Sequence, residues 1–260
     1  MKSVALTIAG SDPSGGAGLQ ADLKTFHQFG VYGEAAVTLI TVQNTQAVSA
    51  VECLTPDLVV RQVQAVVSDI PPQAAKTGAL GNAAIVQAVA DLAATFQFPL
   101  VVDPVMISKH GAPLLDEPAR RALLENLLPR AFLLTPNLHE AAALTASPVD
   151  TLYQMRKAAE KLKQCGARAV LIKGGHLPGE ATDVLLAEDG AFHILHGERF
   201  DTPHTHGTGC TYSAAITALL AIGLSLPDAV ARAKKFISEA IRTNPALGKG
   251  CGPVNHHAQA

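Results

Sequence analysis

The 260-residue sequence contains no tryptophan, and aromatic residues make up only 4% of it. Lys and Arg number 20 and Asp and Glu number 22, so the formal net charge is −2. This balance excludes the broad basic surface of proteins that bind duplex nucleic acid. Charged residues make up only 16% and hydrophobic residues 48%, which excludes a disordered polyelectrolyte. The core must therefore be mainly aliphatic, and any anion must be bound by a few local groups.

Cysteine is also scarce, with four residues at long and irregular spacings, namely Cys53, Cys165, Cys210 and Cys251. This pattern is neither a disulfide framework nor a zinc signature, and free thiols are typical of a reducing cytoplasm. The apolar run Val4–Ala9 meets Asp12 too soon to be a signal peptide. No apolar stretch approaches the roughly 20 residues that cross a bilayer. We therefore expect a soluble cytoplasmic protein.

Short apolar runs alternate with helix-patterned segments, which predicts an α/β fold with a mostly parallel sheet. The predicted strands are Val4–Ala9, Val37–Val42, Ala74–Thr77, Leu100–Val102, Phe132–Leu134 and Ala169–Ile172. The predicted helices are Gly18–Phe29, Pro56–Ser68, Asn82–Phe96, Asp116–Leu127, Leu138–Leu144, Asp150–Gln164, Thr208–Ile222 and Leu226–Thr243. Two short runs flanking Glu188-Asp189-Gly190 predict an antiparallel hairpin at one edge. With no break in composition, we expect one domain over residues 1–260.

Helix boundaries are marked by residues that cap or stop helices. Asp150 is expected to cap the helix that follows it, and Gly166 to stop that helix. Ser225 is expected to cap the last helix, which has Pro227 in its first turn.

In parallel sheets, ligands bind beyond the carboxyl ends of the strands, so the loops there are the candidate site. The loop Gly10–Gly18 follows a strand and opens a helix, which allows its backbone amides to approach a ligand. It lacks the lysine of a P-loop and is a poor GxGxxG match, and a tight turn without a ligand remains an alternative.

Polar residues follow two further strands. Asp103 comes directly after a buried strand and needs a partner, either a metal–phosphate complex or a helix N-terminus. Asn137 and Glu140 form a helix cap followed by a first-turn acid, which is a sufficient structural explanation. The functional alternative is that both face magnesium and nucleotide phosphates.

The segment His204–Thr211 precedes a nearly all-apolar helix and is the most specific of these loops. Its glycines lie where a helix presents unpaired N–H groups, which predicts an anion-binding cradle. Cys210 lies in the first turn, where the pKa of a thiol falls, so it is a candidate base or nucleophile. A small buried core cysteine is the alternative. The pair His204 and His206 lacks a third ligand at a convincing spacing, so a metal site is not expected.

Taken together, these loops resemble the hydroxymethylpyrimidine/phosphomethylpyrimidine kinases, a branch of the ribokinase-like superfamily. The matching stretches are TIAGSDPSGGAGLQADLKTF, TVQNT, AAKTGAL, VVDPVM, TPNLHEAAAL, VLIKGGH, HTHGTGCTYSAAI and GKGCGP, which span positions 7–253. The resemblance implies a single three-layer α/β/α domain that forms a homodimer. It also implies Mg²⁺- and ATP-dependent phosphorylation of 4-amino-5-hydroxymethyl-2-methylpyrimidine, and then of its monophosphate to the diphosphate, in thiamine biosynthesis.

The resemblance also implies roles for individual residues. Gly207, Thr208 and Gly209 would form an anion hole around the transferred phosphoryl group, with Cys210 as the base. The pyrimidine would be bound by Gln43, Gly10, Asp22, Val105 and Leu80. ATP would be bound by Lys173, Asn137 and Thr205, and magnesium by Asp103 and Glu140.

Several alternatives remain open. Many family members have methionine where this chain has Ala79, which puts the choice of substrate in question. The nearest rival is a pyridoxine or pyridoxal kinase of the same fold, because its substrate is also a flat ring with a hydroxymethyl group. A thiol hydrolase that pairs Cys210 with His206 or His176 is a rival of another class, as is a non-catalytic binding module.

Overall fold

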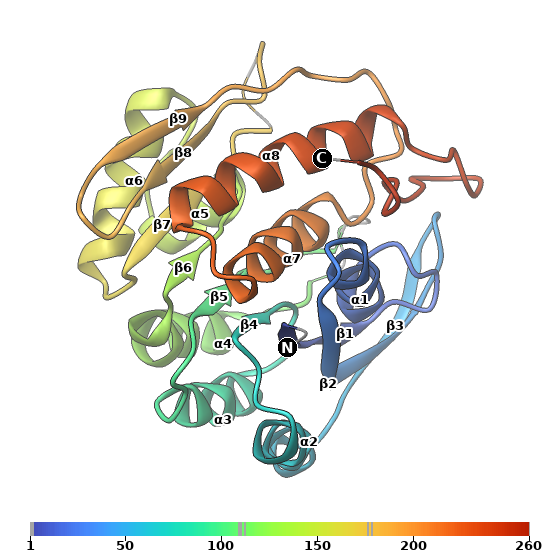
Figure 1. Ribbon diagram of the computed structural model, residues 1–260, viewed down its shortest axis with the longest axis vertical. Coiled ribbons are helices and arrows are strands. Elements are labelled where there is room, and N and C mark those ends of the chain that lie inside the picture. The colour runs from blue at the N-terminus through green and yellow to red at the C-terminus, as the bar shows by residue number, and fades with distance from the viewer. Residues whose placement is uncertain (1–2, 109–110, 112, 176, 178, 260) are drawn as a thin grey trace.

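The computed structural model describes residues 3–108, 111, 113–175, 177 and 179–259. Over these residues one nine-stranded sheet has the order β3-β2-β1-β4-β5-β6-β7-β8-β9 (Figure 1). The strands are β1 (Val4–Ser11), β2 (Tyr32–Gln43), β3 (Val48–Cys53), β4 (Ala74–Thr77), β5 (Leu100–Val102), β6 (Leu133–Leu134), β7 (Ala169–Ile172), β8 (Asp183–Leu186) and β9 (Phe192–Leu195). All six predicted strands and the predicted hairpin are confirmed.

The centre of the sheet is parallel from β2 through β7, and every residue of β4, β5, β6 and β7 is buried. Burial on both faces explains why these strands are continuous rather than alternating apolar runs. The sheet has antiparallel pairs at both ends, β2 with β3 at one end, and β7 with β8 and β8 with β9 at the other. The mostly parallel fold with an antiparallel edge is therefore confirmed, and the β2–β3 edge is an addition that the sequence did not predict.

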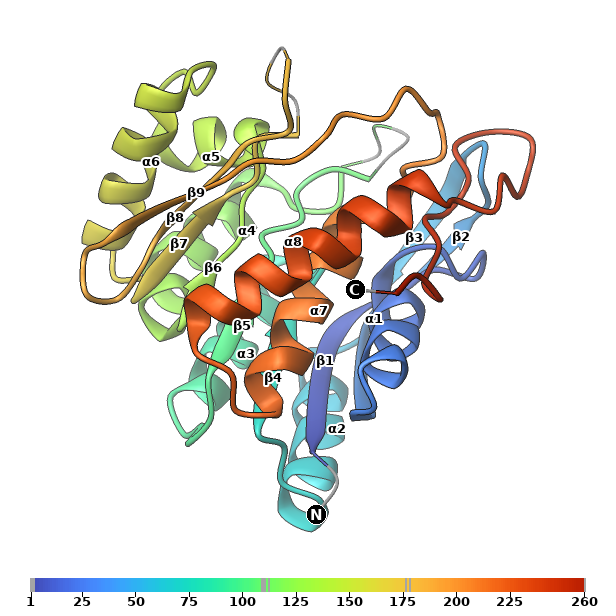
Figure 2. The same cartoon turned by 45° about the horizontal axis from the view of Figure 1, so that its top comes forward.

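Helices cover both faces of the sheet and make three layers (Figures 1 and 2). Helices α1 (Gly18–Gln28), α7 (Thr208–Ala221) and α8 (Leu226–Arg242) lie on one face. The other face carries α2 (Pro56–Asp69), α3 (Ala83–Ala93), α4 (Glu117–Ala122), α5 (Leu138–Thr145) and α6 (Leu152–Gln164). Separate apolar cores fill the two interfaces. The eight predicted helices are thus all present.

Helix α7 is the central helix of its layer, because it packs against α1, α8 and the strands β1, β4 and β5. Ala214, Ala215 and Ala218 are completely buried on it, and these small side chains allow neighbours to approach closely. A helix that is apolar on all sides is typical of such a position. Its N-terminus, which contains Cys210, is thereby held at the carboxyl edge of the sheet.

Local boundaries differ from the predictions in two places. Thr151, rather than Asp150, caps α6, since its hydroxyl accepts a 3.2 Å hydrogen bond from the Gln154 N–H. The helix predicted up to Leu127 leaves α-geometry after Ala122 and continues as a π-helical turn. Ser225 caps α8 as predicted, with its hydroxyl 3.4 Å from the Asp228 N–H.

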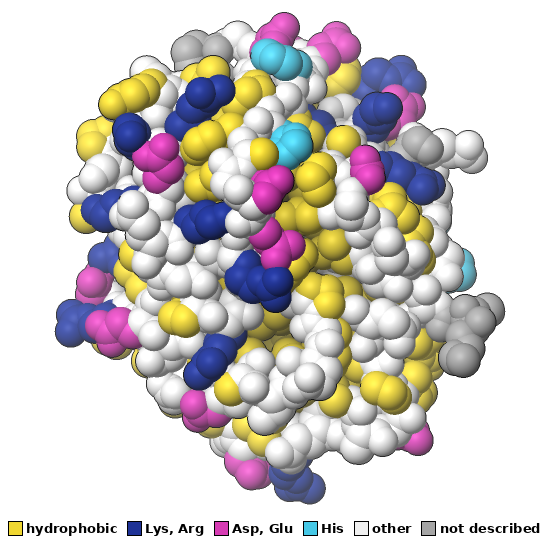
Figure 3. All heavy atoms as spheres, turned by 60° about the vertical axis from the view of Figure 1, so that its left-hand side comes forward, with side chains coloured by type: hydrophobic (Ala, Val, Ile, Leu, Met, Phe, Trp, Pro, Cys, Tyr) yellow, Lys and Arg dark blue, Asp and Glu magenta, His cyan; other side chains and the backbone are white. Residues whose placement is uncertain are grey.

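Basic and acidic side chains are interspersed on the face shown in Figure 3, as the net charge of −2 leads one to expect. Among the described residues, no helix combines the length and the apolar character that crossing a membrane requires.

Candidate active site

A cavity of about 540 Å³ lies at the carboxyl edge of the sheet, beside the N-terminus of α7. It is lined by the loop after β1, the end of β2, the loops after β4, β5, β6 and β7, and the segment before α7. The predicted site residues at this cavity are Gly10, Asp22, Gln43, Asp103, Val105, Asn137, Glu140, Lys173, Thr205, Gly207, Thr208, Gly209 and Cys210. Loops separated by up to about two hundred positions therefore meet at one site.

The predicted anion cradle is formed where α7 begins. Gly207 is the N-cap residue with φ 77°, a left-handed conformation that favours glycine. A Cβ atom there would lie 1.8 Å from the carbonyl oxygen of Gly16, so the two glycine loops touch through their backbones. The first turn of α7 presents backbone N–H groups that lack partners within the helix, and its residues Thr208, Gly209 and Cys210 line the cavity. The Thr208 N–H donates a 3.3 Å hydrogen bond to the Thr205 backbone oxygen.

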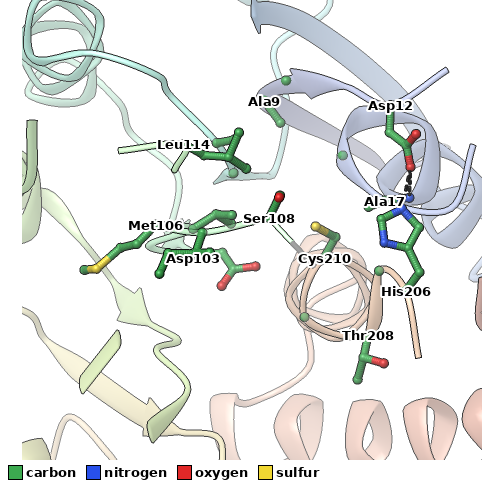
Figure 4. A pocket seen from close by; sticks show the side chains of 18 of the residues that line it. Ala9, Asp12, Ala17, Asp103, Met106, Ser108, Leu114, His206, Thr208 and Cys210 are labelled. Atoms are coloured by element: carbon green, nitrogen blue, oxygen red, sulfur yellow. Dashed lines mark hydrogen bonds and ion pairs between the residues drawn. The ribbon is translucent and has the colours of Figure 1, made fainter. Parts of the chain in front are cut away.

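Asp12 and His206 fasten the two loops together. The His206 ring nitrogen Nε2 lies 2.8 Å from Asp12 Oδ2, and both side chains are buried (Figure 4). The same carboxylate accepts hydrogen bonds from the N–H groups of Ser14 and Ala17. Burial opposes ionisation of Asp12, but hydrogen bonds from His206, Gln43 and Ser14 hold its pKa below the ordinary value. This pair was not predicted from the sequence, because it joins residues 194 positions apart.

Cys210 is half-buried in the first turn of α7 and lines the cavity (Figure 4). Burial raises the pKa of its thiol to about 11, and Asp22 and Asp103 add to the rise, while Lys76 opposes it. The expectation that the helix N-terminus lowers this pKa is therefore wrong for the free protein, because desolvation outweighs it. The thiol is mostly protonated at neutral pH.

Lys76 contacts the site through Cys210 and was not among the residues predicted from the sequence. Its ammonium group is completely buried and lies 2.7 Å from Asp22 Oδ1, while Thr7 donates a 2.6 Å hydrogen bond to the other oxygen of Asp22. Lys76 also donates a 3.4 Å hydrogen bond to the backbone oxygen of Cys210. The signal was available, since a lysine in a strand predicted to be buried requires a charged partner.

Asp103 and Lys173 form an ion pair beside the cradle, with 3.0 Å between Oδ1 and Nζ. Ser213 of α7 donates a 3.1 Å hydrogen bond to the other oxygen of Asp103. Burial opposes ionisation of Asp103, but Lys173, Lys76 and these hydrogen bonds hold its pKa below the ordinary value. A Cβ atom on Gly209 would lie 3.3 Å from Lys173 Nζ, which shows how closely the lysine approaches the start of α7.

Asn137 and Glu140 form a capping box at the start of α5. The Asn137 side chain accepts a 2.9 Å hydrogen bond from the Glu140 N–H, and Glu140 Oε2 accepts a 2.8 Å bond from the Asn137 N–H. Burial and the charge of Asp103 raise the pKa of Glu140 to about 7, against the opposing effect of Lys173. The structural explanation of these two residues is thus correct, and both also line the cavity.

Of the residues predicted to bind the pyrimidine, all but one line the cavity. Gln43 lies at the end of β2 and Val105 after β5, and both line the cavity. Leu80, in contrast, does not line it: the side chain is 2% exposed and packs in the apolar core beneath α3. The placement of Leu80 at the substrate is therefore wrong, and Gly78 and Ala79 form that part of the wall.

Thr205 also lines the cavity. The backbone oxygen of Thr205 accepts a 2.8 Å hydrogen bond from the Thr208 hydroxyl, which ties it to the first turn of α7. His176, one of the two histidines considered as a partner of Cys210, lies outside the described residues.

Residues 12–255 match the family model described as phosphomethylpyrimidine kinase. The chain is 46% identical over 254 residues to the hydroxymethylpyrimidine/phosphomethylpyrimidine kinase of Synechococcus elongatus, covering 97% of both chains. It is 47% identical over 258 residues to the protein of the same name from Haemophilus influenzae, covering 97% of this chain and 96% of that one.

Solved structures with the same fold include two kinds of vitamin kinase. The Bacillus subtilis pyridoxal kinase, solved as an ADP complex, has a TM-score of 0.90 and 40% identity, with coverage of 99% of this chain and 98% of that chain. A phosphomethylpyrimidine kinase from Clostridium difficile has a TM-score of 0.82 and 43% identity, with coverage of 92% and 100%. From its sequence, its fold and its site, the chain belongs to the phosphomethylpyrimidine kinase family and has the ribokinase-like fold.

Proposed function

We propose that the protein uses ATP to phosphorylate the hydroxymethyl group of 4-amino-5-hydroxymethyl-2-methylpyrimidine, and then the monophosphate to the diphosphate, in thiamine biosynthesis. The observation that carries the proposal is that the glycine cradle, Lys173 and Cys210 line one cavity beside the wall that contains Gln43. Phosphoryl transfer depends mainly on positioning and on stabilising charge, with little covalent work for the protein. We infer that the loops around the cavity position the two substrates, and that the N-terminus of α7 and Lys173 stabilise the negative charge.

Each group has a role that its surroundings support. The backbone N–H groups of Gly207, Thr208 and Gly209 hold the transferred phosphoryl group, because a helix N-terminus stabilises negative charge. Lys173 and Thr205 bind the nucleotide phosphates, and Asn137 holds its loop in place through the capping box. Cys210 accepts the proton of the attacking hydroxyl, a transfer that becomes faster as more of the thiol is ionised.

Magnesium fits the acidic part of this site. Asp103 and Glu140 offer carboxylate oxygens at the cavity, and magnesium is commonly held by one or two carboxylates together with phosphates and waters. When bound, magnesium neutralises charge on the phosphates.

Gln43 is the proposed reader of the pyrimidine. A carboxamide presents one acceptor and two donors, which complement the ring nitrogen and amino group of an aminopyrimidine. Gly10 lies on the same wall, where the absence of a side chain makes room for Leu39, since a Cβ atom there would lie 2.5 Å from Leu39 Cδ1. Val105 provides apolar contact for the ring. Asp22 is completely buried against Lys76, so its contribution to substrate binding is indirect.

We further propose that residues 1–260 act as one catalytic domain, because segments from β1 to the start of α7 line the same cavity. We propose that this domain works in the cytoplasm, where its free thiols stay reduced. We also propose a homodimer. Tyr32, Ile40 and Val42 of β2 are exposed apolar side chains that a second copy would cover. The molar mass in solution, measured by light scattering, tests this.

Pyridoxal kinase activity is the second candidate, since a structure of the Staphylococcus aureus pyridoxal kinase with pyridoxal has a TM-score of 0.91 to this chain. A coupled ADP-release assay with each substrate separates the two. We expect a higher kcat/KM for the aminopyrimidine than for pyridoxal or pyridoxine. A clear preference for either vitamin B6 compound would overturn the assignment.

Two rival classes fit the site less well. A thiol hydrolase needs a thiolate nucleophile, but burial raises the pKa of the Cys210 thiol to about 11. Such an enzyme would turn over without ATP and form a trapped covalent intermediate. A binding module would bind substrate and Mg-ATP without releasing ADP. The same coupled assay tests both.

The Cys210→Ala variant tests the base. We expect kcat to fall by about 10²- to 10⁴-fold while the fold is kept. Because the pKa of Cys210 is about 11, kcat of the wild-type protein should rise with pH between 7 and 9, and the residual rate of the variant should not. A near-normal kcat in the variant would leave Cys210 only a structural part of the anion hole.

A further inference from the structure

A completely buried ion pair lies directly beneath the first turn of α7. Lys76 comes from β4 and Asp22 from α1, and both side chains have no exposed surface. Burying two charges is costly unless they are paired and hydrogen-bonded. Lys76, Asp22 and Thr7 meet that requirement, with contacts of 2.7 Å and 2.6 Å to the two carboxylate oxygens. These contacts explain how the pair is tolerated in the interior, but they do not explain why it lies next to Cys210.

The pair touches the residue proposed as the base. Lys76 Nζ lies 3.4 Å from the backbone oxygen of Cys210, and the Ser213 hydroxyl donates a 3.1 Å hydrogen bond to the same oxygen. An ammonium group has three donors, and two of these point to Asp22 and Cys210. The cation is therefore held by the completely buried Asp22 carboxylate and by a backbone oxygen of the first turn of α7.

The charged groups around the Cys210 thiol come from several elements. Lys76 on β4 and Lys173 after β7 favour the thiolate, whereas Asp22 on α1 and Asp103 after β5 disfavour it. The Gly18 N–H at the start of α1 also favours the thiolate. Lys173 is already held at 3.0 Å by Asp103 and is proposed to bind phosphate. Of these two lysines, Lys76 is therefore the one to which no role in phosphate binding is assigned.

We propose that Lys76, held by Asp22 and Thr7, is a positioning residue that stabilises negative charge on Cys210 and orients the first turn of α7. The charge is permanent, since Asp22, Cys210 and Asp103 outweigh burial and raise the pKa of Lys76. The inference deepens the proposed role of Cys210 as the base.

Alkylation of Cys210 by iodoacetamide tests this without any substrate, because the thiolate is the reacting form. Rates are measured between pH 7 and 9 for the wild-type protein and Lys76→Met, with each cysteine followed by peptide mass spectrometry. Each unit by which the pKa rises lowers the thiolate fraction about tenfold, but the more basic thiolate is also the better nucleophile. Loss of the cation should therefore lower the Cys210 rate about threefold or more. The exposed Cys165 of the same molecules is the internal control and should keep its rate.

Two companion variants keep the test decisive. Lys76→Arg retains the charge and should recover much of the Cys210 rate. Asp22→Asn/Lys76→Met removes both buried charges, and serves if the single neutral variant does not fold. It should still react more slowly than the wild-type protein, because Lys76 affects the thiol more strongly than Asp22 does.

A folded Lys76→Met protein whose Cys210 reacts at the wild-type rate would overturn the inference, and so would a double variant that reacts as fast as or faster than wild type. In kinase assays the expected result is a lower kcat with an unchanged KM for ATP. If alkylation responds as expected but Cys210→Ala retains a normal kcat, the role of Cys210 as base fails while the action of Lys76 on the thiol stands.

Discussion

Replacement of Gly207 by alanine tests how the anion cradle is built. At φ 77° an alanine is strained by about 1–2 kcal/mol. Its Cβ atom would also lie 1.8 Å from the Gly16 carbonyl oxygen and 2.8 Å from the Gly16 carbonyl carbon. Neither is the flexible end of a side chain, so one of the two loops has to move. Ordinary contact begins at 3.4 Å, so the displacement needed is about 1.6 Å.

A displacement of this size separates the cradle from the loop after β1. Misplacement by about 1 Å can cost 10²-fold in rate, so we expect kcat of Gly207→Ala to fall at least about 10²-fold. This equals about 2.7 kcal/mol in the activation free energy. The assay is ADP release at saturating pyrimidine and Mg-ATP, with thermal unfolding followed in parallel.

Two other glycines of the cavity serve as matched controls. A Cβ atom at Gly175 meets nothing within 4 Å, so Gly175→Ala should retain most of the activity. At Gly209 the Cβ atom would meet the flexible end of Lys173 at 3.3 Å, so Gly209→Ala should fall between the other two variants. If Gly207→Ala keeps kcat within threefold of the wild-type value, the two loops are not coupled as described.

Three further changes test other parts of the account. Gln43→Ala should raise KM for the pyrimidine about tenfold or more and leave KM for ATP unchanged, because the loss of a hydrogen-bonding side chain costs about 1–3 kcal/mol. An equal rise in both KM values would refute the assignment. Leu80→Ala should lower the free energy of unfolding, measured in urea, by about 2–5 kcal/mol, because the side chain is buried in the core. KM for the pyrimidine should not change, and a raised KM with normal stability would show that Leu80 contacts the substrate. Glu34 is buried on β2 with no hydrogen-bond partner for its carboxylate among the described residues, and burial raises its pKa from 4.5 to about 7. The folded state then binds the proton more tightly than the unfolded state, so stability falls as pH rises between these values. Urea unfolding of Glu34→Gln at pH 5 to 8 should show a smaller fall than the wild-type protein, and parallel curves would contradict the placement of Glu34.

The fold was predictable from the sequence because its signals are local. The buried strands are continuous apolar runs such as Leu100–Val102, and capping residues such as Ser225 mark the helices. The strand β3 was missed because Val48–Cys53 forms an edge whose residues are half-buried or exposed, so no apolar pattern marks it. The cap of α6 was misplaced because Asp150 and Thr151 are both good capping residues, and only geometry decides between them.

The site was predictable at the level of loops, and the interactions between the loops were not. The position of Cys210 at a helix N-terminus was correct, but its pKa depends on burial, which the local sequence does not report. Leu80 lies next to a cavity residue, and the side chain turns into the core instead. The contact between Asp12 and His206 exists only because α1 and α7 pack side by side. Lys76 was the exception, since its charge within a buried strand was visible in the sequence.

The proposed phosphorylation of an aminopyrimidine in this cavity is tested most directly by a product time course. The purified protein is mixed with Mg-ATP and 4-amino-5-hydroxymethyl-2-methylpyrimidine, and monophosphate and diphosphate are separated by chromatography. We expect the monophosphate to appear first and the diphosphate to follow, with one ADP released for each phosphate transferred, and Cys210→Ala to slow the first transfer. Absence of phosphorylated pyrimidine from a folded protein that binds Mg-ATP would contradict this proposal.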